Sequence, residues 1–350
     1  RMVWWALGHS SQQINMAAQV SCWYLLAALT VGGVVLNEKI SRISFALYIL
    51  FISMASAHHL LVDPGLSPAW KVWNTSYAMY LAVLASMVHG FTVPGGIEMG
   101  QRLRGFTQGK FQWLTRAPWG DPGFSALFLS LVIFGFGGGI TGVVIGTEQI
   151  NIIAHNTLRI PGHFHMTVVG GTALCFMGVT YYLLPLIFRR RIALYPLARI
   201  QPYLFGGGIT LMGISMTYAG TFGVPRRHWD ISFTGAPFGI QFPPVVDLFM
   251  AATAIGGILA FLGGMIYVAV AVISVFFTPR LSDSELTTTQ KGLPSGVIAL
   301  PRQVHTKEQA ELAHRQGTPG TIILVVIFFV CFVLYYFANW KVLAMLWKVG

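Results

Sequence analysis

Charged side chains are scarce in this sequence, and that scarcity excludes several classes of protein. Only 9% of the 350 residues are Asp, Glu, Lys or Arg, whereas 55% are hydrophobic. A soluble domain carries roughly 25% charged residues, and a disordered chain needs low hydrophobicity and high charge. Neither class fits, and the long apolar runs with a positive mean hydropathy are typical of a polytopic membrane protein.

Disulfide patterns and targeting signals are also missing. Cys22, Cys175 and Cys331 lie inside apolar runs and form neither a CxxC motif nor a disulfide framework. The sequence enters an apolar stretch almost at once after Arg1, and no pattern of a signal peptide precedes that stretch. We therefore expect a truncated piece of a longer chain, or one half of a split protein.

Eight apolar windows are long enough to cross a bilayer as helices. They cover residues 4–36, 41–62, 73–95, 123–147, 161–188, 201–223, 245–277 and 319–347. Alternation with a period of two is weak, which favours helices over a membrane barrel. The sequence predicts an all-α, polytopic membrane bundle of about eight transmembrane helices. We expect one domain over residues 1–350, with residues 279–318 as a connecting loop.

The net charge of +11 could indicate nucleic-acid binding, but the positions of the basic residues favour another explanation. Most of them lie in the loops after the first, third, fifth and seventh predicted helices. The opposite loops contribute chiefly Lys71, Arg159, Arg226 and Arg227. This asymmetry is the positive-inside pattern of membrane proteins. It predicts that the 279–318 loop is cytoplasmic and that no nucleic acid is a partner.

Histidines in the predicted spans are the first candidates for chemistry, because ionisable residues inside a membrane are costly and usually functional. His163 and His165 are two positions apart and project about 200° apart on a helix. They can therefore serve two different prosthetic groups. His58 and His59 differ by only about 100° and can converge with a third imidazole, for which His9 is available. Three neutral imidazoles suit copper, iron or zinc.

Three short blocks around these residues resemble the catalytic subunit of heme-copper oxidases. They read WWALGHSS (4–11), SAHHLLVDPG (56–65) and IPGHFHMT (160–167). The flanking pieces DPGLSPAWK, EMGQRLRG, HNTLRIPGHFH and GVPRR (223–227) are similar to the B-type branch in particular. The resemblance covers the whole chain, but only the family's helices from the sixth onward.

The resemblance implies a role for each histidine. His163 would be the axial ligand of a high-spin heme, and His165 one axial ligand of a low-spin heme. The second ligand of the low-spin heme belongs to a family helix outside this chain. His9, His58 and His59 would hold a second metal opposite the high-spin heme.

The same resemblance extends to two arginines, and the donor set bears on the identity of the second metal. Arg226 and Arg227 match the family's pair that contacts heme propionates, which guanidinium groups bind well. Three histidines without a carboxylate favour copper, whereas non-heme iron usually recruits a carboxylate as well. Glu98 and Glu148, at the ends of predicted spans, are the carboxylates that could reach inward.

One departure from the family's pattern bears on the substrate. Oxygen-reducing members carry a tyrosine one helical turn after the first metal-binding histidine, and this chain has Gln13 at that position. An amide cannot yield a phenoxyl radical, but it can donate and accept hydrogen bonds. Loss of the tyrosine is a feature of the superfamily's nitric oxide reductases. We therefore predict reduction of NO to N₂O, with Gln13 in the catalytic site.

Two alternatives remain from the sequence. The first is a cytochrome c or quinol oxidase that reduces O₂ to water with proton translocation. The second is a membrane transporter, for which the glycine-rich FGGGITG (136–142) is suggestive. The redox reading implies a prokaryotic inner (cytoplasmic) membrane, surrounding lipid and a gas as substrate. It also implies that the missing N-terminal helices, or a split subunit that carries them, are partners of this chain. Electrons would come from another subunit, cytochrome c or quinol.

Protons must also reach a buried site of this kind. Polar residues on the first and third predicted spans could form a hydroxyl-lined route, although such residues often only join neighbouring helices. They are Gln19, Tyr24, Thr30, Tyr80, Ser86 and Thr92.

Overall fold

The computed structural model describes the chain except for residues 1, 53, 55–57, 283–305 and 347–350. The described part is helical, and the backbone pairs as β-structure there only at two isolated bridges. The α-helices are α1 (Met2–Val31), α2 (Glu38–Leu47), α3 (Pro68–Trp73), α4 (Met79–Leu103), α5 (Gln112–Thr115), α6 (Pro122–Val132), α7 (Ile140–Gly146), α8 (Glu148–Ala154), α9 (Arg159–Phe164), α10 (Leu174–Phe188), α11 (Tyr195–Thr221), α12 (Val245–Phe277), α14 (Lys307–Gln316) and α15 (Pro319–Leu346). Four π-helical segments, η1 (Tyr48–Ile52), η3 (Asn74–Ala78), η4 (Ile133–Gly139) and η5 (His165–Ala173), interrupt or extend them. The predicted all-α class is confirmed.

Within the described residues, six helical segments are long and apolar enough to cross a membrane, compared with eight predicted windows. They are Ile14–Val31, Pro68–Leu103, Pro122–Gly146, Arg159–Phe188, Val245–Phe277 and Pro319–Val342. All but the last two residues of the predicted window 201–223 fall within α11, which has 27 residues but is less apolar than α12. The window 41–62 begins in α2 and η1, and residues 53 and 55–57 of it lie outside the described chain.

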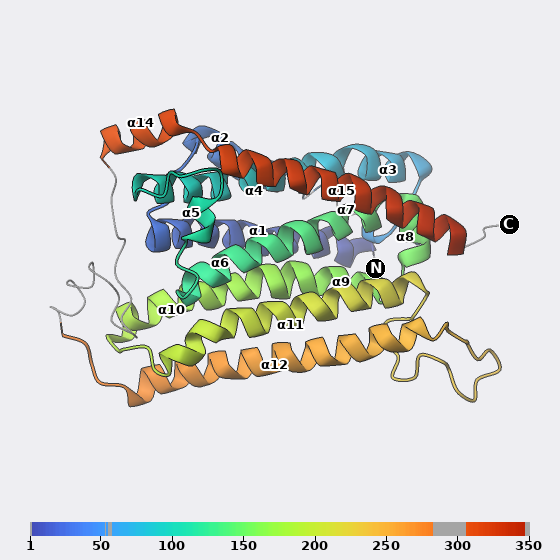
Figure 1. Ribbon diagram of the computed structural model, residues 1–350. Coiled ribbons are helices and arrows are strands. Elements are labelled where there is room, and N and C mark those ends of the chain that lie inside the picture. The colour runs from blue at the N-terminus through green and yellow to red at the C-terminus, as the bar shows by residue number, and fades with distance from the viewer. Residues whose placement is uncertain (1, 53, 55–57, 283–305, 347–350) are drawn as a thin grey trace.

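The long helices lie side by side in a bundle, with α12 along one flank and α15 along the other (Figure 1). A buried core joins α1, α6 and α10 through side chains such as Trp23, Phe124 and Tyr181. Glycines bring α11 and α12 into close contact. A Cβ at Gly208 would lie 2.4 Å from the Ala260 nitrogen, and one at Gly256 would lie 2.5 Å from the Met212 nitrogen. Small residues of this kind allow membrane helices to approach closely.

The loops gather at the two ends of the bundle (Figure 1). At one end, the segments after α10 and α12 meet, where the Leu281 nitrogen donates to the Arg189 carbonyl at 2.7 Å. At the opposite end, the loop after α11 contacts the segment before α9, where the Leu158 nitrogen donates to the Val224 carbonyl at 2.9 Å. The arginines after α10 (Arg189, Arg190 and Arg191) and Arg280 after α12 therefore share one end, as the predicted sidedness requires.

The predicted connecting loop 279–318 is partly helical. A short helix, α14, occupies Lys307–Gln316, and Thr306 caps it with a side-chain hydrogen bond to the Gln309 nitrogen. Residues 283–305 of this loop lie outside the described chain. The chain then enters α15 at Pro319.

Candidate metal centre

The segment that carries His163 changes its helical type at the histidines themselves. The α-helix α9 ends at Phe164, and the π-helical segment η5 begins at His165. π-Helical turns inside helices are rare and often mark functional sites. The glycine-rich η4 packs against η5, so a second irregular segment flanks the histidines.

His163 is held by a backbone acceptor that fixes its tautomer. Its Nδ1 lies 3.0 Å from the Gly138 carbonyl oxygen and 3.1 Å from the Thr141 hydroxyl. A carbonyl can only accept, so in the neutral ring Nδ1 carries the proton and donates it. The lone pair is then on Nε2, which is the arrangement of a metal-binding histidine oriented by a second partner.

His165 has the same arrangement with a different partner. Its Nδ1 lies 2.7 Å from the carbonyl oxygen of Pro161, one turn earlier in the chain. The Nδ1 proton is again committed, and Nε2 again has the lone pair. The partners of the His163 ring come from η4 and α7, whereas the His165 partner comes from α9. The two imidazoles therefore have separate surroundings, as two separate prosthetic groups require.

Two glycines near His163 make room for neighbouring side chains, Gly142 for the ring of His163 itself and Gly138 for Thr167. A Cβ on Gly142 would lie 2.8 Å from Cε1 of His163, and one on Gly138 would lie 2.5 Å from the Thr167 side chain. Both glycines belong to the run FGGGITG (136–142), which alone is also compatible with a transporter. In the structure this run brings η4 and α7 against the histidine helix. Together with the donor chemistry, this shows that the surroundings of His163 suit a metal-bound imidazole.

The predicted second-metal histidines are only partly described. The rings of His58 and His59 lie 4.2 Å apart between centroids, at an interplanar angle of 39°. The carbonyl oxygen of His58 accepts a hydrogen bond from the Asn151 amide at 3.2 Å, which ties this turn to α8. His9 belongs to α1, and its side chain lies outside the described part. Among the described side chains, no group of three His, Cys, Asp or Glu residues is placed to hold a metal.

Gln13 lies four positions after His9 in the continuous helix α1. The side chain of Gln13, like that of His9, is outside the described residues. Residues four apart in an α-helix share a face, so positions 9 and 13 lie on the same face of α1.

The two arginines after α11 differ in their surroundings. The guanidinium of Arg226 donates to the Asn156 side-chain oxygen at 2.9 Å, and the Arg226 nitrogen donates to the Asn156 carbonyl at 2.8 Å. Asn156 lies seven positions before His163, so Arg226 is joined to the segment that leads into the histidine helix. Arg227 has a positive φ of 68° and an exposed side chain.

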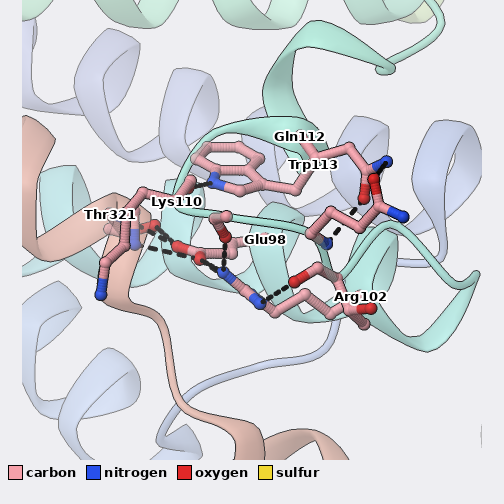
Figure 2. Close-up of polar contacts among 10 residues, drawn as sticks. Glu98, Arg102, Lys110, Gln112, Trp113 and Thr321 are labelled. Atoms are coloured by element: carbon pink, nitrogen blue, oxygen red, sulfur yellow. Dashed lines mark hydrogen bonds and ion pairs between the residues drawn. The ribbon is translucent and has the colours of Figure 1, made fainter.

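The two carboxylates that could have reached the metal are engaged elsewhere. Glu98 is fully buried and forms an ion pair with Arg102 at 2.8 Å, and it also contacts the start of α15 (Figure 2). Glu148 lies 3.6 Å from the Lys71 ammonium group. Neither carboxylate is therefore held ready as an extra metal ligand.

Two residues of the predicted hydroxyl route, Tyr24 and Thr92, are hydrogen-bonded to each other, and two further residues that sequence reasoning did not include join them. The hydroxyl of Tyr24 lies 2.6 Å from Thr92, 3.0 Å from Ser41 and 3.1 Å from Nδ1 of His89. Ser41 and His89 were not predicted. A polar residue on α2 and a lone histidine give no local signal, because only the packing of α1, α2 and α4 brings them to Tyr24.

The remaining predicted members do not join this group directly. Ser86 pairs with Tyr48 at 3.1 Å, and Gln19 accepts from Thr172 at 2.7 Å. Thr30 donates to the carbonyl of Leu26 in its own helix. The side chain of Tyr80 is exposed.

Comparison with known proteins gives consistent matches. Residues 1–259 match the family model described as Cytochrome C and Quinol oxidase polypeptide I. Cytochrome c oxidase subunit 1 of Thermus thermophilus is 29% identical over 288 residues, which are 82% of this chain and 50% of that protein. The corresponding subunit of Halobacterium salinarum is 26% identical over 176 residues, or 49% of this chain and 26% of that protein.

The fold has a similar match. A heme-copper terminal oxidase solved as a dimer by cryo-EM superposes with a TM-score of 0.72 and 26% identity. The match covers 94% of this chain and 56% of that chain. The matched part of the chain thus spans about half the length of the Thermus thermophilus subunit and of this solved oxidase.

Proposed function

The chain belongs to the Cytochrome C and Quinol oxidase polypeptide I family, and we propose that it is the catalytic part of a respiratory enzyme that reduces nitric oxide to nitrous oxide. The family match and the relatives support a membrane oxidoreductase of the heme-copper type. The choice of nitric oxide rests on one observation, which is Gln13 four positions after His9 in α1.

His163 and His165 would each bind one heme. Their Nδ1 atoms are committed to the carbonyls of Gly138 and Pro161, so each can offer Nε2. We assign His163 to the high-spin heme and His165 to the low-spin heme, whose second ligand lies outside this chain. Arg226 and Arg227 would pair with heme propionates. The tie between Arg226 and Asn156 supports this assignment, because it holds the arginine beside the segment that leads to His163.

The second metal would be held by His9, His58 and His59. We propose copper, because three imidazoles without a carboxylate favour it over non-heme iron. The engagement of Glu98 with Arg102 and of Glu148 with Lys71 supports the choice. When bound, the heme and the copper would together supply the two electrons that the reaction consumes.

The overall reaction is 2 NO + 2 e⁻ + 2 H⁺ → N₂O + H₂O. An N–N bond forms, and one N–O bond breaks with its oxygen leaving as water. No electron from a protein radical is needed, so a side chain without a redox-active phenol suffices at position 13. The Gln13 amide would donate a hydrogen bond to a substrate oxygen, as preorganised donors do where negative charge develops. The remaining requirements are protons and an electron donor.

The proposed partners follow from the fact that this chain matches only about half the length of related subunits. We propose that the missing half, present as preceding helices or as a separate subunit, completes the low-spin heme site. Electrons would arrive from another subunit, cytochrome c or quinol. The whole assembly would lie in the inner membrane of a prokaryote, with its basic loops facing the cytoplasm and lipid around the bundle.

Oxygen reduction is the second candidate, because the relatives are named as cytochrome c oxidases. The deciding experiment uses the intact complex with one electron donor. It compares anaerobic N₂O formation from NO with O₂ uptake. Rapid N₂O formation with negligible O₂ uptake is the expected result. Fast O₂ uptake with slow N₂O formation would contradict the proposal, and the histidine assignments would stand.

A further inference from the structure

Arg159 is a buried cation that the proposed function leaves unused. It is the first residue of α9, is 1% exposed, and begins the membrane-spanning segment Arg159–Phe188. Its guanidinium donates to the Thr221 hydroxyl at 2.6 Å and to the Asn339 side-chain oxygen at 2.9 Å. Its Nε has no hydrogen-bond partner among the described residues. Both observed partners are neutral.

No acidic side chain of the described chain lies within 4.0 Å of this guanidinium. Arg102, the other buried arginine that donates to a side chain, has Glu98 as its counter-ion at 2.8 Å. The start of a helix is also the positive end of its dipole, which disfavours a cation there. The C-terminal end of α11 at Thr221 is the negative end of that helix dipole, and it carries only a fraction of an elementary charge. It therefore offsets only part of the positive charge of Arg159. Arg159 therefore keeps a net positive charge in a region where charge is costly.

That charge lies close to the proposed heme ligand. Arg159 and His163 are four positions apart in α9, which places them on one helix face about 6 Å apart along the axis. Electrostatic interactions are strong where water is excluded, because the effective dielectric constant is low. Arginine does not lose its proton in proteins, so the charge is permanent.

We propose that Arg159 is a fixed cation that raises the reduction potential of the heme on His163. This inference rests on the proposed function. Reduction of a heme held by His163 would take one electron from the enzyme's donor and would lower the charge of that heme by one. No covalent bond changes, and Arg159 keeps its proton. A nearby uncompensated cation favours the state with less positive charge, so it stabilises the ferrous heme.

A structural role for Arg159 makes different predictions, because the same side chain also joins α9 to α11 and α15. Arg159→Gln removes the charge and keeps hydrogen-bonding groups. Arg159→Met removes the charge and keeps the apolar length. Arg159→Lys keeps the charge and loses the forked geometry. If the role is only structural, the potential of the heme will not follow the charge at this position.

The test is an anaerobic redox titration of the intact membrane complex, followed by the visible spectra of the high-spin and low-spin hemes. We expect the midpoint potential of the high-spin heme to become more negative in Arg159→Gln and Arg159→Met, and to stay near the wild-type value in Arg159→Lys. The control is Arg42→Gln, which removes an exposed cation already paired with Glu38 at 2.6 Å, and it should cause no shift.

Three outcomes would overturn the inference. The first is an unshifted potential in Arg159→Gln and Arg159→Met with heme content retained. The second is an equal shift in Arg159→Lys. The third is loss of heme from both charge-removing variants but not from Arg159→Lys, which would show that the charge is needed to bind the heme rather than to set its potential. Absence of heme from the unaltered complex would instead contradict the proposed function itself, and this inference with it.

Discussion

Glu98 and Thr321 lie 223 positions apart in the chain and are joined by two hydrogen bonds. The Thr321 nitrogen donates to Oε2 of Glu98 at 2.7 Å, and the Thr321 hydroxyl donates to the same oxygen at 2.8 Å (Figure 2). The other carboxylate oxygen pairs with Arg102 and accepts from the Gly320 nitrogen at 3.1 Å. A helix start favours negative charge, so Glu98 both neutralises Arg102 and caps α15.

We expect Glu98→Ala to destabilise the bundle by about 3–5 kcal/mol, because it leaves Arg102 buried without a counter-ion. Thermal unfolding of the detergent-solubilised protein measures the effect. The matched control is Glu38→Ala, since Glu38 pairs with Arg42 on an exposed surface where ion pairs contribute little. Equal unfolding temperatures for Glu98→Ala and Glu38→Ala would contradict the role of Glu98.

A second prediction concerns the glycine beside His163. Gly142→Ala introduces a methyl group 2.8 Å from Cε1 of His163, so the ring or α7 must move. We expect partial loss or a spectral change of the high-spin heme, measured by visible absorbance and heme content. Gly207→Ala is the control, because nothing lies within 4 Å of an added Cβ there. A wild-type spectrum in both variants would contradict the assignment of His163 as the ligand of the high-spin heme.

The two histidines of the HFH sequence should be separable by substitution. His163→Ala should remove the high-spin heme, whereas His165→Ala should change the low-spin heme spectrum. The reason is that each imidazole has its own backbone partner and its own surroundings. Heme extraction and low-temperature visible spectra of the intact complex provide the measurement. Identical spectral losses in the two variants would show that both rings serve one group.

Local sequence patterns were enough to predict the helical class and that His163 and His165 have separate surroundings. The spacing of His163 and His165 requires only the geometry of one helix, so no tertiary information was needed. The run FGGGITG was ambiguous in the sequence, because glycines occur both in broken transporter helices and at tight helix contacts. Its contact with His163 depends on how α7 packs, which no local pattern encodes.

Other features depend on distant packing and could not be predicted. Glu98 is a possible metal ligand when only its position at a span end is known, and the partner that engages it is 223 positions later. From the sequence alone, Arg159 is one of the few basic residues assigned to the loops on the side opposite the positively charged one. Its burial and its neutral partners, Thr221 and Asn339, come from α11 and α15. The predicted span at 41–62 begins as the short helices α2 and η1.

The last prediction addresses the residue on which the substrate assignment depends. Gln13→Leu removes the hydrogen-bonding amide while nearly preserving volume, and we expect NO reduction to slow by about 10²–10³-fold, as for loss of a preorganised donor. Heme and copper contents should not change, because Gln13 is not assigned as a ligand. Ser11→Ala is the control, since Ser11 is exposed and, two positions after His9, projects about 200° away from it on α1. Unchanged N₂O formation in Gln13→Leu would exclude a catalytic role. Loss of copper together with activity would instead indicate that residue 13 supports the metal site, and the argument for nitric oxide would then need a different residue.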